Sequence, residues 1–428
     1  PDGRIRFLTS RKADECSLFR FSGRFASALL EVRAAMKNIP KGFRLGTAGA
    51  GFRRPGRDDL GLIISDQPAV AAGVFTTNAF KAAPVQIAQE TLRRGPMVQG
   101  VLVNSGQANA CTGEEGLRNC RATLDMVGRA AGVDPWALLP MSTGVIGDQL
   151  KMDLWEKAVP ALVNSLGGRD AETFTRAMMT TDAFPKFVER SVTLSGGMVR
   201  LVGMAKGAGM ICPNMATMLS VVLCDARVSV NAWQDMFRIA VARTFNRVTV
   251  DGDTSTNDTV LGLANGASGV DALGADAALL EETLEAVLGG LAYMLVQDGE
   301  GATKVLHIRV IGAADVADAE KVARTVGHSQ LVKTAMYGRD ANWGRIVAAV
   351  GRSGARFRSD DVQVRLCGVE LFRDGRPVPG NHDAKLAEPL KQRDLDVEIR
   401  LGTGEGEYTL LASDLSHDYV TCNADYRT

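Results

Sequence analysis

The sequence is poor in the residues that bind metal ions, form disulfides or attract polyanions. It has only four histidines in 428 residues, and their wide spacing gives a metal site little support. Its seven cysteines show no CxxC spacing, a pattern typical of a reduced, cytoplasmic protein rather than of a disulfide-stabilised one. Lysine plus arginine and aspartate plus glutamate both total 49, so the zero net charge favours neither nucleic acid nor an anionic membrane as a partner. No apolar run approaches the ~18–20 residues that span a bilayer. We therefore expect a cytoplasmic protein without a metal or cofactor of its own.

Most of the chain alternates between strand and helix patterns, which predicts an α/β (α+β) fold. The length suffices for two domains or for one large α/β body. Residues 1–38 are different, because they are rich in arginine and contain only one short amphipathic pattern. We expect them to be a peripheral extension, with the organised body starting at residue 39. A targeting segment is the alternative, although its acidic residues argue against one.

Apolar runs between turn residues predict the strands of the body. Residues 60–66 and 70–77 are expected to be two strands separated by a Gln-Pro turn. Residues 141–147, MSTGVIG, are expected to be a loop that leads into a helix over 150–166. Backbone amides on such a loop are good donors to an oxyanion, but the sequence pattern by itself favours a plain turn.

The stretch 206–226, KGAGMICPNMATMLSVVLCDA, organises the rest of the chain. Its residues 218–224 predict a strand buried on both faces. Pro213 and Asn214 predict a sharp bend just before that strand, and Thr217 stands between bend and strand. One interpretation makes Thr217 an ordinary first residue of the strand. The other is that its hydroxyl attacks the preceding peptide bond and cuts the chain between Ala216 and Thr217.

Such a cut would give Thr217 a free α-amine beside its hydroxyl. A threonine hydroxyl is a poor nucleophile until a base removes its proton. An unperturbed α-amine titrates near ~7.7–8.0, close to a working pH, and is therefore a suitable base. The local chemistry permits this mechanism without requiring it.

Three further polar segments contain candidate binding groups. In TTDAFPK (180–186), Asp182 and Lys186 can form a solvated surface pair. GDTSTNDT (252–259) has neither GK[ST] nor EF-hand spacing, so it is more suited to bracing a site than to holding a metal. In QDGEGATK (297–304), Glu300 on a glycine turn is either a plain surface acid or a partner for a substrate ammonium group.

Three separated motifs together resemble the ornithine acetyltransferase (glutamate N-acetyltransferase) family of arginine biosynthesis. They are STGVIG at 142–147, KGAGMICPNMATML at 206–219 and NADYRT at 423–428, and the resemblance runs from about Pro40 to the last residue. It implies a self-processing, N-terminal-nucleophile-like layered fold. It also implies cleavage into intertwined fragments, 39–216 and 217–428, that assemble as a heterotetramer of two α and two β fragments.

The same resemblance assigns roles to individual residues. Thr217 is the acetyl carrier and cleavage product, and Thr143 and Gly144 supply the oxyanion hole. The segment Thr-Thr-Asp at 180–182 lines the substrate pocket. This leaves open whether Thr180 or Thr181 contacts the substrate. The remaining substrate-binding residues that it implies are Lys206, Glu300, Asn423 and Thr428.

The implied activity is transfer of an acetyl group from N2-acetylornithine to glutamate through acetyl-Thr217. Whether acetyl-CoA is also accepted as a donor stays open. One alternative is a self-processing aminopeptidase or amidohydrolase of related architecture, which would give the acyl group to water. A second alternative is an uncleaved binding protein.

Overall fold

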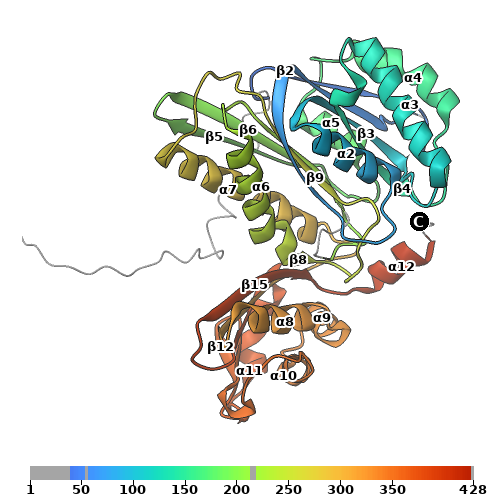
Figure 1. The fold of residues 1–428 in the computed structure, drawn as a ribbon. Helices are drawn as coiled ribbons and strands as arrows, with labels where there is room; N and C mark the ends of the chain where they lie inside the picture. The colour runs from blue at the N-terminus through green and yellow to red at the C-terminus, as the bar shows by residue number, and fades with distance from the viewer. Residues whose placement is uncertain (1–38, 54–55, 213–217, 426–428) are drawn as a thin grey trace, which may run out of the picture. The chain divides into compact units, whose positions relative to one another are not determined.

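A computed structural model describes residues 39–53, 56–212 and 218–425. Its larger sheet has eight strands in the order β4-β3-β2-β9-β7-β6-β5, with β1 paired to β2 (Figure 1). The strands are β1 (Phe43–Ala48), β2 (Leu60–Phe75), β3 (Met97–Gln107), β4 (Leu138–Val145), β5 (Lys186–Leu194), β6 (Gly197–Lys206), β7 (Leu219–Cys224) and β9 (Thr259–Ala264). Pairing is antiparallel except between β3 and β4 and between β7 and β9.

Helices cover both faces of this sheet. The long helix α7 (Ala275–Gln297) packs on β5 and β6, and α6 (Val230–Arg243) packs beside it on β2. On the other face, α5 (Ala171–Met178) contacts β1 and β6. The remaining helices of this part lie toward β1 to β4, and they are α2 (Ala83–Arg94), α3 (Gly113–Ala131) and α4 (Met152–Asn164).

Strand β7 lies in the middle of the sheet, and all six of its residues are buried. Val222 belongs to the core cluster that contains residues of α6 and α7. Its neighbour Val221 belongs to the cluster that contains residues of α5. This confirms the predicted strand with two buried faces, because successive side chains of a strand point to opposite sides.

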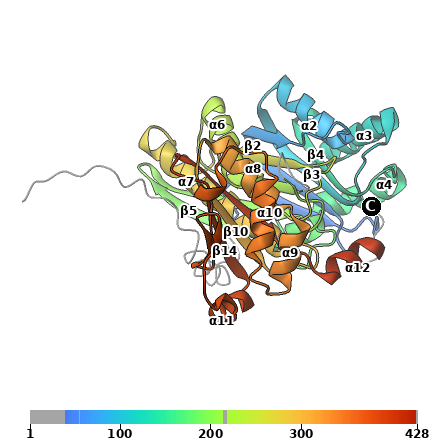
Figure 2. The same ribbon diagram turned by 90° about the horizontal axis from the view of Figure 1, so that it is seen from below.

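A second sheet of seven strands has the order β13-β12-β11-β14-β10-β15-β8. Helix α8 packs on β10 and β15, while α9 and α10 lie beside it (Figure 2). The strands are β8 (Val248–Thr249), β10 (Val305–Ala313), β11 (Gln363–Leu366), β12 (Val369–Arg373), β13 (Arg376–Pro377), β14 (Asp394–Arg400) and β15 (Gly406–Ser413). The helices are α8 (Val316–Gly327), α9 (Gln330–Tyr337), α10 (Trp343–Gly351), α11 (His382–Leu386) and α12 (His417–Asp425). No helix of the described ranges is long and apolar enough to cross a membrane.

The larger sheet interleaves the two predicted fragments. Strands β7 and β9 come from residues after 217, and they lie between β6 and β2, which come from residues before 216. The layered α/β class with intertwined fragments is thus confirmed. The extension 1–38 and the bond between Ala216 and Thr217 lie outside the described residues, so the fragment boundaries stay predictions.

Two expectations about local structure were wrong. Residues 60–75 form one strand, and a register irregularity between Ile64 and Ala69 takes the place of the turn expected between two strands. Thr143 and Gly144 lie at the end of strand β4 and not in a loop, since β4 extends to Val145 and pairs with β3 over its whole length.

Candidate active site

One pocket gathers every predicted site residue that the structure describes. Its lining includes Thr143, Gly144, Thr180, Thr181, Lys206, Glu300 and Asn423, together with residues that had been given no role of their own, among them Ser255 and Asn257 of the GDTSTNDT segment. Ala216, Thr217 and Thr428 lie outside the described residues. The structure therefore brings together predicted site residues from five separate parts of the sequence, while their individual roles stay predictions.

The pocket forms where strands β4 and β6 end. Lys206 is the last residue of β6 and is buried, and its Nζ donates to the Thr143 hydroxyl on β4 at 3.3 Å. Burial lowers the pKa of this ammonium group, and the nearby Asp182 carboxylate partly offsets that effect. Among the described residues its hydrogen-bond acceptor is a neutral hydroxyl, and such a buried cation is suited to receive an anionic group of a ligand.

The segment after Lys206 is held tightly on its way to the predicted cleavage site. The amides of Met210 and Ile211 donate to the two carboxylate oxygens of Asp251, at 2.5 and 2.8 Å. Beyond the region that is not described, the Met218 amide donates to Asp258 at 2.9 Å. Two carboxylates thus fix the chain on either side of Thr217, and both belong to the polar stretch that runs from β8 to β9.

Glu300 sits where this segment approaches the end of α7. Its amide donates to the Ala208 carbonyl at 2.8 Å, and its Oε2 accepts from Asn423 Nδ2 at 2.9 Å. A side chain at Gly209 would meet the Glu300 carboxylate at 2.4 Å, so a larger residue there would displace Glu300 from its present position. The exposed helix α12 therefore contributes to the pocket through Asn423, although its Val420 is 63% exposed.

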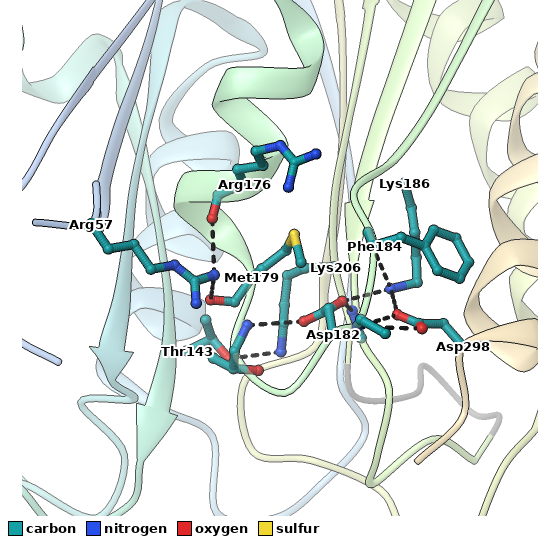
Figure 3. A network of polar contacts seen from close by, with 12 residues as sticks. Arg57, Thr143, Arg176, Met179, Asp182, Phe184, Lys186, Lys206 and Asp298 are labelled. Carbon is teal, nitrogen blue, oxygen red and sulfur yellow. Dashed lines mark hydrogen bonds and ion pairs between the residues drawn. The ribbon is translucent and has the colours of Figure 1, made fainter. Parts of the chain in front are cut away.

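Beside Lys206 lies a buried charge network (Figure 3). Lys186 Nζ contacts the carboxylates of Asp182, at 2.7 Å, and of Asp298. Asp182 also accepts from the amides of Thr180, at 2.9 Å, and Gly207, at 2.7 Å. The surface pair expected for Asp182 and Lys186 was therefore wrong, because both side chains are fully buried.

The pKa values of the two carboxyl groups of this network shift in opposite directions. Burial by itself would raise the pKa of Asp182, but Lys186 and Lys206 hold it well below its usual value. Burial raises the pKa of Asp298, and Lys186 only opposes that rise. Asp182 therefore carries the negative charge that balances Lys186 and Lys206.

Among the described residues, no group of three or more His, Cys, Asp or Glu is arranged to hold a metal ion. The arrangement instead offers an ammonium, a carboxylate, an amide and several hydroxyls around a small pocket at strand ends. A mixed α/β fold with such a pocket defines an enzyme for a small charged substrate.

The chain belongs to the ArgJ family, whose model matches residues 44–428. The arginine biosynthesis bifunctional protein ArgJ of Nitratidesulfovibrio vulgaris is 67% identical over 393 residues, which cover 92% of this chain and all of that protein. ArgJ of Geobacter sulfurreducens is 46% identical, over 91% of this chain and 99% of its own length. The crystal structure of ArgJ from Bacillus halodurans aligns with 47% of this chain and 96% of its own, at 35% identity and a TM-score of 0.46. Family membership confirms the resemblance stated from the three motifs.

Proposed function

We propose that this protein is a glutamate N-acetyltransferase of arginine biosynthesis. It cuts itself between Ala216 and Thr217, takes an acetyl group from N2-acetylornithine onto Thr217, and passes that group to glutamate. The observation that carries this proposal is the ArgJ family match over residues 44–428, supported by a pocket that contains all seven of the predicted site residues within the described ranges.

The first half-reaction forms an ester. The Thr217 hydroxyl attacks the acetyl carbonyl carbon while its own α-amine takes the hydroxyl proton. Donors at Thr143 and Gly144 stabilise the oxyanion as the C–N bond breaks, and the leaving amine of ornithine receives the proton. The second half-reaction runs in the opposite sense, with the glutamate amine attacking the ester and the proton returning to Thr217.

Charge complementarity supports the choice of substrates. Both N2-acetylornithine and glutamate carry an α-carboxylate, which Lys206 can pair with from its buried position. Glu300 suits the side-chain ammonium of ornithine, and Asn423 is in place beside it. The pocket thus has one partner for the group that the two substrates share and one for the group that distinguishes them.

Three finer statements belong to the same proposal. Acetyl-CoA serves as a second donor, in line with the name bifunctional that the curated relatives carry. The two fragments assemble as a heterotetramer of two α and two β fragments. The enzyme works in the cytoplasm, as its cysteine pattern favours.

A donor comparison tests the activity. Purified protein is assayed with glutamate as acceptor and either N2-acetylornithine or acetyl-CoA as donor, beside a Thr217→Ala variant. We expect acetylglutamate from acetylornithine in ping-pong kinetics, and none from Thr217→Ala. Free acetate without acetylglutamate would instead identify a hydrolase, and unchanged activity of Thr217→Ala would leave only a non-covalent mechanism.

A further inference from the structure

Asn257 lies in the pocket wall with every polar group of its side chain engaged. Its Nδ2 donates to the carbonyl of Ala108, at 2.6 Å, and to the carbonyl of Ser142, at 2.9 Å. Its Oδ1 accepts from the Thr256 hydroxyl at 2.6 Å. Two carbonyl partners require the donor end of the amide, so the orientation of this side chain follows from chemistry. Both N–H donors of the side chain are therefore engaged by the protein.

The two carbonyls that Asn257 holds flank Thr143 and Gly144. Ser142 directly precedes Thr143 on β4. Ala108 follows the end of β3, and its amide donates to Val145, the residue after Gly144, at 3.0 Å. One side chain from the loop before β9 therefore fixes both ends of the pair that is proposed to form the oxyanion hole.

Fixing the Ser142 carbonyl also fixes the direction of a donor. A trans peptide is planar, and its C=O and N–H point to opposite sides. Holding the Ser142 carbonyl toward Asn257 therefore sets the direction of the Thr143 N–H. It also sets the position of the Thr143 Cα, from which the side chain extends. Catalytic donors must keep their geometry closely, since a displacement of about 1 Å costs about 10²-fold in rate.

The surrounding backbone leaves little room for another arrangement. Gly144 has φ +136°, and a side chain there would lie 2.1 Å from the carbonyl carbon of Gly106. The ends of β3 and β4 are thus in direct contact. The Asn257 side chain, from the loop before β9, forms hydrogen bonds with both of these chain segments. When the Asn257 amide is lost, two buried carbonyls lose their donor, and this small region has to shift to satisfy them.

We propose that Asn257 is a positioning residue for acetyl transfer, whose amide holds Thr143 and Gly144 in the geometry that stabilises the oxyanion. The inference rests on the proposed oxyanion role of Thr143 and Gly144. It adds to that function a residue of the GDTSTNDT loop, which no motif had assigned beyond bracing the site.

Asn265 offers a matched control at the other end of the same strand. Asn257 precedes β9 and Asn265 follows it, and both are 6% exposed. Asn265 Nδ2 likewise donates to two acceptors, the Lys41 carbonyl at 3.0 Å and the Ser65 hydroxyl at 3.2 Å. Asn265 is absent from the pocket lining. Its loss should weaken the fold as much without touching the active site.

The experiment compares Asn257→Ala, Asn257→Ser and Asn265→Ala in the full-length protein. The readouts are kcat and KM for acetylornithine per cleaved site, with the cleaved fraction from mass spectrometry and Tm from thermal unfolding. For Asn257→Ala we expect kcat to fall about 10–100-fold, below the ~10²–10³-fold loss of a whole oxyanion donor, with KM changed less than about threefold. Asn257→Ser, which keeps one donor, should lie between it and the wild type. Asn265→Ala should keep kcat within about twofold while losing a similar amount of Tm.

Four results would overturn the inference: wild-type kcat in Asn257→Ala, an equal loss of kcat in Asn265→Ala, a rise in KM with kcat unchanged, or a folded Asn257→Ala chain that stays uncleaved. If Asn257→Ala does not fold, the ratio between Asn257→Ser and the wild type decides in the same way. Failure of the proposed function would show in the wild-type protein itself, as absence of acetyl transfer. Failure of the Asn257 inference shows only in the variants.

Discussion

Lys206 and Glu300 give the pocket one cationic and one anionic side chain, and each is set by its surroundings. Lys206 is buried at the end of β6, where it contacts the Thr143 hydroxyl. Glu300 is fixed through its amide and through Asn423. In the proposed roles, the two charges together select a ligand that carries both a carboxylate and an ammonium group, as amino acids do.

Replacing Lys206 with Met should raise KM far more than it lowers kcat. A hydrogen bond to a charged group contributes about 1.5–3 kcal/mol, so we expect KM for both acetylornithine and glutamate to rise about 10–100-fold. Steady-state kinetics with each substrate varied in turn measures this.

Lys304 supplies the control, because its ammonium donates to three backbone carbonyls in the turn before β14, those of Leu390, Lys391 and Gln392. Lys304→Met should lower stability and leave both KM values unchanged. An unchanged KM in Lys206→Met would remove Lys206 from the substrate site.

Residues in short motifs could be predicted from the sequence, whereas residues that act through distant partners could not. Thr143, Lys206 and Asn423 stand in distinctive strings, and the structure places them in one pocket. Asn257 bonds to carbonyls that lie 149 and 115 residues earlier in the chain. Nothing in the sequence around Asn257 indicates those partners, because the fold alone brings the loop before β9 beside the ends of β3 and β4.

At the scale of elements, the charge network joins three chain segments that line the pocket. Asp182 lies between α5 and β5, Lys186 opens β5, and Asp298 ends α7. Asp182 also holds the amides of Thr180 and Gly207. The network therefore ties the Thr180 loop, the end of β6 and the Glu300 turn to one buried ammonium group.

Replacing Lys186 with Met should destabilise the protein strongly, since it removes the one ammonium group that contacts both Asp182 and Asp298 in the buried network. Breaking a buried ion pair in this way costs about 3–5 kcal/mol. Urea unfolding would measure the loss.

Lys157→Met is the control for that loss. Lys157 and Asp153 have the same i,i+4 spacing, but their side chains are 76% and 71% exposed. Such a surface pair contributes about 1 kcal/mol or less. Equal effects of the two substitutions would contradict the role of the buried network.

The same comparison shows why sequence spacing misjudged Asp182 and Lys186. Both pairs have acid and base four residues apart, yet one is on the surface and the other is buried. What buries Asp182 and Lys186 is the end of α7, whose Asp298 lies 112 residues after Lys186. The strand β7, in contrast, was predicted well, because a run of apolar residues is a local signal.

At the scale of the whole molecule, cleavage should leave the two fragments together. Strands β7 and β9 pair with β6 and β2 through long antiparallel ladders, and the clusters on both faces contain residues from both fragments. Breaking one peptide bond removes none of these contacts. Cleaved protein should therefore elute as one species in native size-exclusion chromatography and separate only in denaturant. Separation without denaturant would contradict the interleaved sheet.

Acidification should destabilise the protein partly through His328, which contacts Cys212 just before the predicted bend. Burial, together with Arg324, Lys333 and Arg352, lowers the pKa of His328 to about 4 from its usual 6.5. Between pH 6.5 and 4 the unfolded chain binds a proton that the folded chain does not, so stability falls as the pH falls through that window.

Urea unfolding at several pH values tests this. A His328→Gln variant should lose part of the pH dependence between 6.5 and 4, while His417→Gln, at an exposed position, should keep it. Identical pH profiles for the wild type and His328→Gln would show that His328 does not titrate in the folded protein as described.

The central claim is that a chain break turns Thr217 into an acetyl carrier, and fragment analysis tests it most directly. Purified protein is incubated with N2-acetylornithine in the absence of glutamate, and its fragments are examined by intact mass spectrometry and N-terminal sequencing. The account predicts two fragments, the second starting at Thr217 and heavier by one acetyl group until glutamate is added. An intact chain, or an acetyl group on any other residue, would contradict it.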